Sequence, residues 1–210
     1  MIEEEKQRLA NMLMYEKEFK SEGYKYIAGV DEAGRGPLCG PVVAAAVIFL
    51  SNDIDIEGIN DSKKISEKKR EKIYEELVNS ENVIYAVGMS SVEVIEKVNI
   101  LNATKLAMKE AISKLKIKPD YVIIDGNQKL DIEMSSLTLI SGDSKSASIA
   151  AASIIAKVTR DRMLREYDIK YPEYGFLNNK GYGTKMHIEA IKKYGLCEIH
   201  RPSFCKHFVK

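Results

Sequence analysis

The sequence contains no tryptophan, only three cysteines and no apolar run long enough to cross a bilayer. An odd and sparse set of cysteines (Cys39, Cys197 and Cys205) argues against a disulfide framework and favours a reducing compartment. The longest apolar run, residues 42–50, supplies about half of the length that a membrane span requires. The N-terminal residues lack the basic and apolar regions of a secretory signal. These absences predict a cytoplasmic protein.

Net charge is also nearly absent, because 32 Lys and Arg residues and 31 Asp and Glu residues leave a formal charge of +1. Any argument for nucleic-acid binding therefore has to come from local charge. Residues 63–72 hold six basic residues, and residues 180–210 hold seven. Two such segments on either side of an acidic centre would suit a polyanion, although each segment taken alone is more typical of a solvated helix face.

A length of 210 residues with 45% hydrophobic and 30% charged residues indicates one globular domain with a possible appendage. Apolar patterning predicts five strands, at 24–30, 42–50, 82–89, 121–124 and 137–140. Helices are expected at 3–20, 66–78, 100–115, 143–167 and 185–194. Short early connections favour antiparallel pairing, and a later helical crossover favours parallel pairing. The predicted fold is α/β, a mixed five-stranded sheet flanked by helices.

Carboxylates follow apolar segments at several junctions of the chain. Asp31 and Glu32 come after the predicted strand 24–30, Asp125 ends another strand, and Asp143 opens the Ala-rich helix. Taken singly, these acids are common turn or N-cap residues. Consecutive strand residues point to opposite faces, so Asp31 and Glu32 can serve one site only if Glu32 lies where the strand breaks.

Together the four acids favour a metal site, because strand ends in α/β sheets gather at one edge. Clustered carboxylates repel one another unless cations compensate them. Oxygen ligands without nearby His or Cys favour Mg²⁺ or Mn²⁺. Such a cluster supports phosphoryl transfer with two divalent ions.

Two glycine-containing segments could contact a nucleic acid. Backbone N–H groups of Gly34-Arg35-Gly36 could approach a sugar or phosphate, although a plain turn explains them equally well. Tyr182 lies between two glycines and could stack on a sugar or base, or pack on its own domain. The C-terminal spacing Cys-x₂-His-x₄-Cys-x-His matches none of the usual structural zinc patterns, so we expect no zinc there.

Ordered blocks of the chain resemble the signature blocks of bacterial ribonuclease HII. They are residues 29–38 (Gly-Val-Asp-Glu-Ala-Gly-Arg-Gly-Pro-Leu), 60–64, 124–126, 142–145, 150–154, 156–158, 181–183 and 200–204. The resemblance runs from about residue 23 to about residue 205. It implies a ribonuclease H-like catalytic domain over 23–170, an N-terminal helix over 1–22 and a C-terminal helical, substrate-binding extension over 171–210.

The resemblance implies an endonuclease that cuts the RNA strand of RNA–DNA hybrids and the 5′ side of ribonucleotides embedded in duplex DNA. Products would carry 5′-phosphate and 3′-hydroxyl ends. By position, the metal-binding carboxylates would be Asp31, Glu32, Asp125 and Asp143. Gly34, Arg35, Gly36 and Tyr182 match the part that reads the RNA–DNA junction, and Lys63 and Lys145 fall in blocks near the phosphates. We expect a monomer.

Arg35 separates this chain from the similar ribonuclease HIII, which normally carries Lys in that loop and has an extra N-terminal domain. Cys39 stands where the family more often has Ala. Two other interpretations remain at this point. A resolvase or integrase would keep the acidic site for another polynucleotide, and a non-catalytic nucleic-acid-binding module would use the acids for structure.

Overall fold

The computed structural model describes residues 3–209. Its strands are β1 (Ile27–Ala33), β2 (Val42–Phe49), β3 (Val83–Ser90), β4 (Tyr121–Asp125) and β5 (Ser135–Leu139). Its α-helices are α1 (Glu3–Met12), α2 (Met14–Ser21), α3 (Glu67–Asn79), α4 (Val92–Ser113), α5 (Ala147–Lys170), α6 (Phe176–Asn179), α7 (Lys185–Tyr194) and α8 (Pro202–Cys205). Two short 3₁₀ helices are η1 (Gly142–Ser144) and η2 (Pro172–Tyr174).

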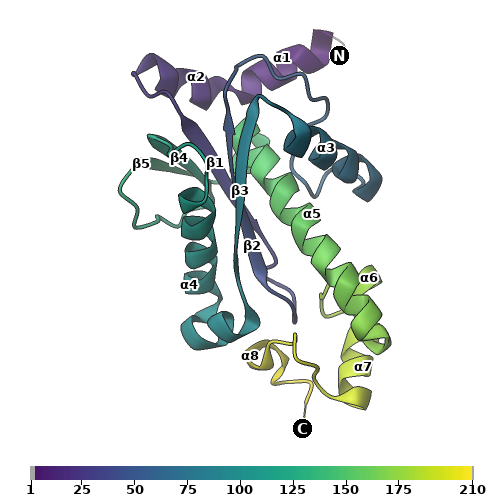
Figure 1. The fold of residues 1–210 in the computed structure, drawn as a ribbon. Helices are drawn as coiled ribbons and strands as arrows, with labels where there is room; N and C mark the ends of the chain where they lie inside the picture. The colour runs from purple at the N-terminus through teal and green to yellow at the C-terminus, as the bar shows by residue number, and fades with distance from the viewer. Residues whose placement is uncertain (1–2, 210) are drawn as a thin grey trace.

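The strands form one mixed sheet in the order β3-β2-β1-β4-β5 (Figure 1). β1 pairs antiparallel with β2, and β2 pairs antiparallel with β3. β1, β4 and β5 run parallel to one another. The predicted mixed α/β sheet is therefore confirmed. The carboxyl ends of the three parallel strands meet at one edge, which is where a binding site is expected in such sheets.

Helices cover both faces of the sheet, with α5 on one face and α4 on the other. Strand alternation divides β1 between them: Ala28 and Val30 pack into the core on the α4 side, whereas Ile27 packs with Ile149 of α5. All eight residues of β2 are buried, which agrees with its continuous apolar sequence. The sheet is a covered layer except at its ends.

Several predicted boundaries were wrong for local reasons. The expected helix 3–20 is two helices separated at the buried Leu13. α4 begins eight residues earlier than predicted, at Val92 rather than residue 100. Its N-cap Ser91 accepts a hydrogen bond from the Val94 amide, and Asn99 kinks it with φ at 68°. As the absence of a predicted helix between 124 and 137 implies, β4 and β5 are joined by an irregular loop, which packs Leu130 onto the α4 side.

The C-terminal segment has a small apolar core of its own, which joins the sheet domain through Leu38, Cys39 and Leu164. Figure 1 shows α7 and α8 at the opposite end of the molecule from α1 and α2. Within residues 3–209 all three cysteines are free. In the same range, no helix has both the length and the apolar character needed to cross a membrane.

Gly29 of β1 lies directly against the start of α5. A methyl group on Gly29 would overlap backbone atoms of Ser148 and Ile149. Gly29→Ala should therefore lower the free energy of unfolding by about 1–3 kcal/mol, because the helix has to move away from the sheet. Urea unfolding tests this. Gly36→Ala is the control, since its new methyl group would meet only a Tyr182 ring carbon at 3.6 Å, and equal losses in both variants would contradict the prediction.

Candidate active site

Acidic side chains lie at the carboxyl ends of the three parallel strands. β1 leaves β4 after the pair Val30–Ile124, and Asp31 follows at once. Asp125 is the last residue of β4, and Asp143 lies in η1, shortly after β5 ends. The fold therefore brings together acids that are more than a hundred positions apart in the chain.

Hydrogen bonds connect these acids through their surroundings. Asp125 Oδ1 accepts a hydrogen bond from the Gly142 amide at 2.6 Å, which joins the end of β4 to the turn that carries Asp143. Asp31 Oδ1 accepts the amide of the following residue, Glu32, at 2.6 Å. The Ser153 hydroxyl of α5 lies 2.8 Å from the Ser62 hydroxyl. Hydrogen bonds therefore join β4 to η1, and α5 to the loop before α3.

The local electrostatics show that negative charge is concentrated here. Burial, with the carboxylates of Glu32 and Asp125, raises the pKa of Asp31 well above its ordinary value. Burial also raises the pKa of Glu32, although Arg35 opposes this effect through an ion pair of 3.2 Å. Burial and the carboxylates of Asp61 and Asp125 raise the pKa of Asp143. The negative charge on each of these ionised acids is therefore not fully compensated by nearby positive groups.

The acidic cluster also changes the pKa of a basic side chain, Lys63. Burial alone would lower its pKa, but the carboxylates of Asp31, Asp143, Asp61 and Asp125 together raise it. Asp61 also accepts the Lys63 amide at 2.9 Å, so it orients the backbone of Lys63. The sequence analysis missed Asp61, although it lies in the quoted block 60–64. Lys145 is exposed and donates to the Ile140 carbonyl at 2.8 Å.

Two local expectations about the acids were wrong. β1 does not break before Glu32 but continues to Ala33, paired with Val43 of β2. By alternation Glu32 therefore belongs to the α4 face and Asp31 to the α5 face. Glu32 and Asp125 still influence each other, because β1 and β4 are neighbouring strands and their pairing ends at Val30–Ile124. Asp143 does not open α5 either: it lies in η1, and Ser146 is the N-cap of the helix.

The acids fit hard divalent cations by their chemistry, because they are buried oxygen donors with insufficient positive compensation. Within residues 3–209, no three His, Cys, Asp or Glu side chains are already arranged to hold one ion. Carboxylates would therefore have to rotate to share a cation. The four acids remain the predicted ligand set.

Two buried arginines shape the loop 34–41 that follows β1. Arg201 donates to the carbonyl oxygens of Gly34, Arg35, Pro37 and Gly40 at distances of 2.6–3.1 Å. Arg160 donates to the carbonyl oxygens of Cys39 and Pro41 and of Lys180. The loop is consequently held from inside by its carbonyl groups. Neither role was predicted, because the sequence carries no signal for contacts across 121 and 167 positions.

Tyr182 lies beside this loop. A Cβ atom at Gly36 would lie 3.6 Å from the Tyr182 ring, and the ring is 49% exposed. The preceding Gly181 carbonyl accepts the Leu38 amide at 2.8 Å. The structure therefore brings together the predicted glycine loop and the predicted stacking ring, which are almost 150 positions apart in the chain.

Two buried histidines, His187 and His200, hold the backbone carbonyl of Tyr182 through a series of hydrogen bonds. The Cys197 amide donates to His200 Nδ1 at 3.0 Å, so the neutral His200 carries its proton on Nε2. That proton is donated to His187 Nε2 at 3.0 Å. His187 must then carry its own proton on Nδ1, which it donates to the Tyr182 carbonyl at 2.9 Å. Each donor in this series of hydrogen bonds has an acceptor when both imidazole rings are neutral.

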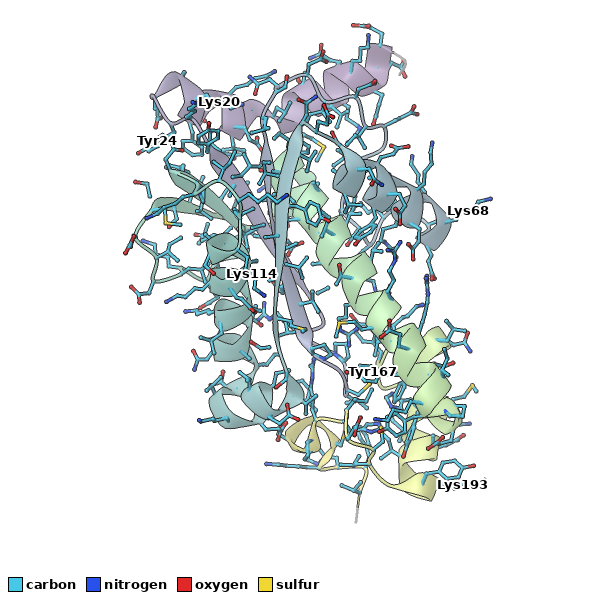
Figure 2. All side chains as sticks on the ribbon, viewed as in Figure 1. Lys20, Tyr24, Lys68, Lys114, Tyr167 and Lys193 are labelled. Atoms are coloured by element: carbon cyan, nitrogen blue, oxygen red, sulfur yellow. The ribbon has the colours of Figure 1, made fainter. Side chains whose placement is uncertain are left out.

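The two basic segments lie apart on the molecule. Figure 2 shows Lys68 pointing outward from α3, and Lys193 at the far end of the molecule, in the last turn of α7. Lys180, at the start of the second segment, forms an ion pair of 3.3 Å with Glu67 of α3. The extension therefore contacts α3, and the exposed lysines of both segments remain available to a polyanion.

Comparisons with known proteins agree with this geometry. The family model described as Ribonuclease HII matches residues 28–207. Ribonuclease HII of Acetivibrio thermocellus is 57% identical over 99% of this chain and 80% of its own length. The ribonuclease H2 structure from Pyrococcus horikoshii superposes with a TM-score of 0.72 at 31% identity, covering 87% of this chain and 96% of that chain. The ribonuclease HII in a complex with PCNA from Archaeoglobus fulgidus gives 0.70 at 28% identity, covering 84% and 93%.

The histidine pair predicts a loss of stability in acid. Burial and the neighbouring His187 lower the pKa of His200 from 6.5 to about 4, and burial lowers the pKa of His187. At these two histidines the unfolded chain then binds more protons than the folded protein below about pH 6.5. The contribution of His200 to the free energy of unfolding is therefore complete above that pH. It decreases towards pH 4 by at most about 1.4 kcal/mol per pH unit.

Urea unfolding at pH 7 and at pH 5 measures this dependence. His200→Asn, whose side-chain oxygen can still accept the Cys197 amide, should show a smaller difference between the two pH values than the wild type. His207→Gln, on an exposed side chain, should keep the wild-type difference. An unchanged pH dependence in His200→Asn would refute the assignment.

Proposed function

The chain belongs to the ribonuclease HII family, and we propose that its four carboxylates hold the divalent cations that the reaction requires. As a member of this family it is a metal-dependent endoribonuclease that hydrolyses the RNA strand of RNA–DNA hybrids and cuts on the 5′ side of ribonucleotides embedded in duplex DNA, leaving 5′-phosphate and 3′-hydroxyl ends. The observation that carries the assignment of the site is the group of buried acids with raised pKa values at one edge of the sheet.

The proposed ligands are Asp31, Glu32, Asp125 and Asp143. Two bound ions, Mg²⁺ or Mn²⁺, would activate a water molecule and stabilise the leaving oxygen. The protein's own contribution is to hold the ligands before the ions arrive. The Gly142 amide orients Asp125, and the Glu32 amide donates to Asp31. Oxygen ligands serve Mg²⁺ and Mn²⁺ alike.

The remaining predicted residues would bind the nucleic acid. Lys63 is exposed beside the acids and would contact a phosphate next to the scissile bond. The loop Gly34-Arg35-Gly36 would present backbone groups to the 2′-hydroxyl, since Arg201 and Arg160 already occupy several of the loop carbonyls. Tyr182 would stack on the neighbouring deoxyribose.

We assign a weaker role to Lys145, which would contact the backbone farther from the cut. The segment 171–210 would act as the substrate-binding extension, with 23–170 as the catalytic domain and 1–22 as the N-terminal helical segment. The protein would work as a monomer in the cytoplasm. The close placement of the glycine loop and Tyr182 favours a hybrid nuclease over a resolvase or integrase, which would need neither feature.

Asp125→Asn tests the metal site with little change of shape. The Asn oxygen can still accept the Gly142 amide, but a negatively charged metal ligand is lost. Cleavage of a labelled DNA duplex with one ribonucleotide should decrease by at least about a hundredfold, and chelator should abolish wild-type cleavage. Asp131→Asn, which changes an exposed carboxylate in the next loop, should cut normally. Normal cleavage by Asp125→Asn would instead support a non-catalytic binding module.

Tyr182→Ala tests the proposed stacking role. Cleavage at a single embedded ribonucleotide should decrease about tenfold, since a stacked ring contributes about 1–3 kcal/mol. Tyr182→Phe keeps the ring and should retain most of the rate. Tyr194→Ala removes another exposed tyrosine of the extension and should have no effect. An unchanged rate in Tyr182→Ala, with Mn²⁺ binding also unchanged, would remove the stacking role.

A further inference from the structure

The N-terminal helices α1 and α2 precede residue 28, where the family match begins. They nevertheless lie next to the active site: Figure 1 shows them across one end of the sheet, beside the start of α5. Nothing in the proposed function uses them. Their side chains contact two of the segments that carry site residues, and these contacts are polar.

Glu16 of α2 is buried, with 3% of its surface exposed, at the start of α5. Its Oε1 accepts three hydrogen bonds: from the Ser146 hydroxyl at 2.7 Å, the Ser148 hydroxyl at 2.6 Å and the Ser148 amide at 3.0 Å. The positive end of the α5 dipole and its free amides lie at this place, so an acidic side chain is favourable here.

The Glu16 contacts lead directly to Asp143. Ser146 is the N-cap of α5, and its amide donates to the Gly142 carbonyl at 2.8 Å. The Gly142 amide in turn donates to Asp125. The turn that carries Asp143 is therefore held between Asp125 on one side and the Ser146 that Glu16 binds on the other.

A packing role alone does not explain Glu16. Its second oxygen, Oε2, is buried and has no hydrogen-bond partner among residues 3–209. A buried carboxylate with an unused oxygen costs stability, and an apolar side chain could fill the same space without that cost. The presence of an acid at this position is therefore explained by its other oxygen, Oε1, which fixes the first turn of α5 through hydrogen bonds.

α1 makes a second polar contact with the site. Glu5 Oε1 accepts the Gly58 amide at 2.7 Å, and Arg8 donates to the Ile59 carbonyl at 2.8 Å. A bidentate ion pair of 2.6–2.7 Å joins Glu5 and Arg8. This backbone leads directly into the loop 60–64 that carries Lys63.

We infer that α1 and α2 form a clamp on the active site, in which Glu16 positions the metal ligand Asp143 by fixing the first turn of α5. Glu5 and Arg8 hold the neighbouring loop in the same way. Glu16 is a positioning residue and touches neither substrate nor metal. The inference rests on the proposed function, because Asp143 is a metal ligand only under that proposal.

Direct measurement of Mn²⁺ binding by calorimetry on the full chain tests the clamp, together with cleavage as a function of Mn²⁺ concentration. Glu16→Ala should raise the Kd for Mn²⁺ and the half-saturating Mn²⁺ concentration about tenfold, the lower end of what the loss of outer-shell partners costs. The KM for a hybrid substrate at saturating Mn²⁺ should stay unchanged, because the substrate-reading loop is held by other residues. Glu16→Gln keeps an acceptor oxygen and should recover most of the affinity.

Glu18→Ala, on an exposed acid of the same helix, is the matched control. A folded Glu16→Ala protein that binds Mn²⁺ as tightly as Glu18→Ala would refute the clamp. Ser148→Ala removes one donor to Glu16 and keeps the test open if Glu16→Ala does not fold: weaker Mn²⁺ binding supports the clamp, and unchanged binding refutes it. If the wild type binds no Mn²⁺ at all, the proposed metal site itself fails, which is a different result from a clamp that fails on a metal-binding wild type.

Discussion

The packing of α5 against β1 is the contact on which the rest of the active site depends. α5 runs along β1 in the same direction: Ser148 contacts Gly29 in the middle of the strand, and Arg160 contacts Gly34 just beyond its end. Asp31 lies between these points, on the face of β1 that α5 covers. Any side chain in place of either glycine would overlap atoms of the helix, so the approach requires glycine. One helix therefore aligns the first carboxylate and the glycine loop.

This alignment places acids and arginines in the same region without neutralising the acids. The guanidinium groups of Arg160 and Arg201 are directed to backbone carbonyls of the loop and the extension. Burial and mutual repulsion therefore still raise the pKa values of Asp31 and Asp143. Arg35 pairs with Glu32 alone; if Arg160 and Arg201 paired with Asp31 and Asp143, those acids would have less need of a cation. The arrangement keeps the loop rigid and leaves the carboxylates to a cation.

Apolar pattern was sufficient to predict the sheet, because buried strands such as β2 have a sequence that few other structures accommodate. It was insufficient for helix boundaries, since the predicted helix 3–20 is divided at Leu13 and α4 begins at Val92. Positions after strands identified the acids and the glycine loop. Contacts between distant polar residues had no such signal: Arg201 reaches Gly34 across 167 positions, and Glu16 reaches Ser148 across 132. Pairings of this kind depend on tertiary structure.

The two ends of the chain support different halves of the site. At the C-terminal end, Arg201 holds the glycine loop, and His187 holds the Tyr182 carbonyl, so this end supports the part that we propose reads the substrate. At the N-terminal end, Glu16 binds Ser146 beside the turn of Asp143, so that end supports the part that we propose holds metal. α5 connects both ends, because Glu16 binds its first turn and its residue Arg160 binds the extension. Under this proposal, metal affinity and substrate reading depend on separate supports along one helix, and changes at one end need not alter the other.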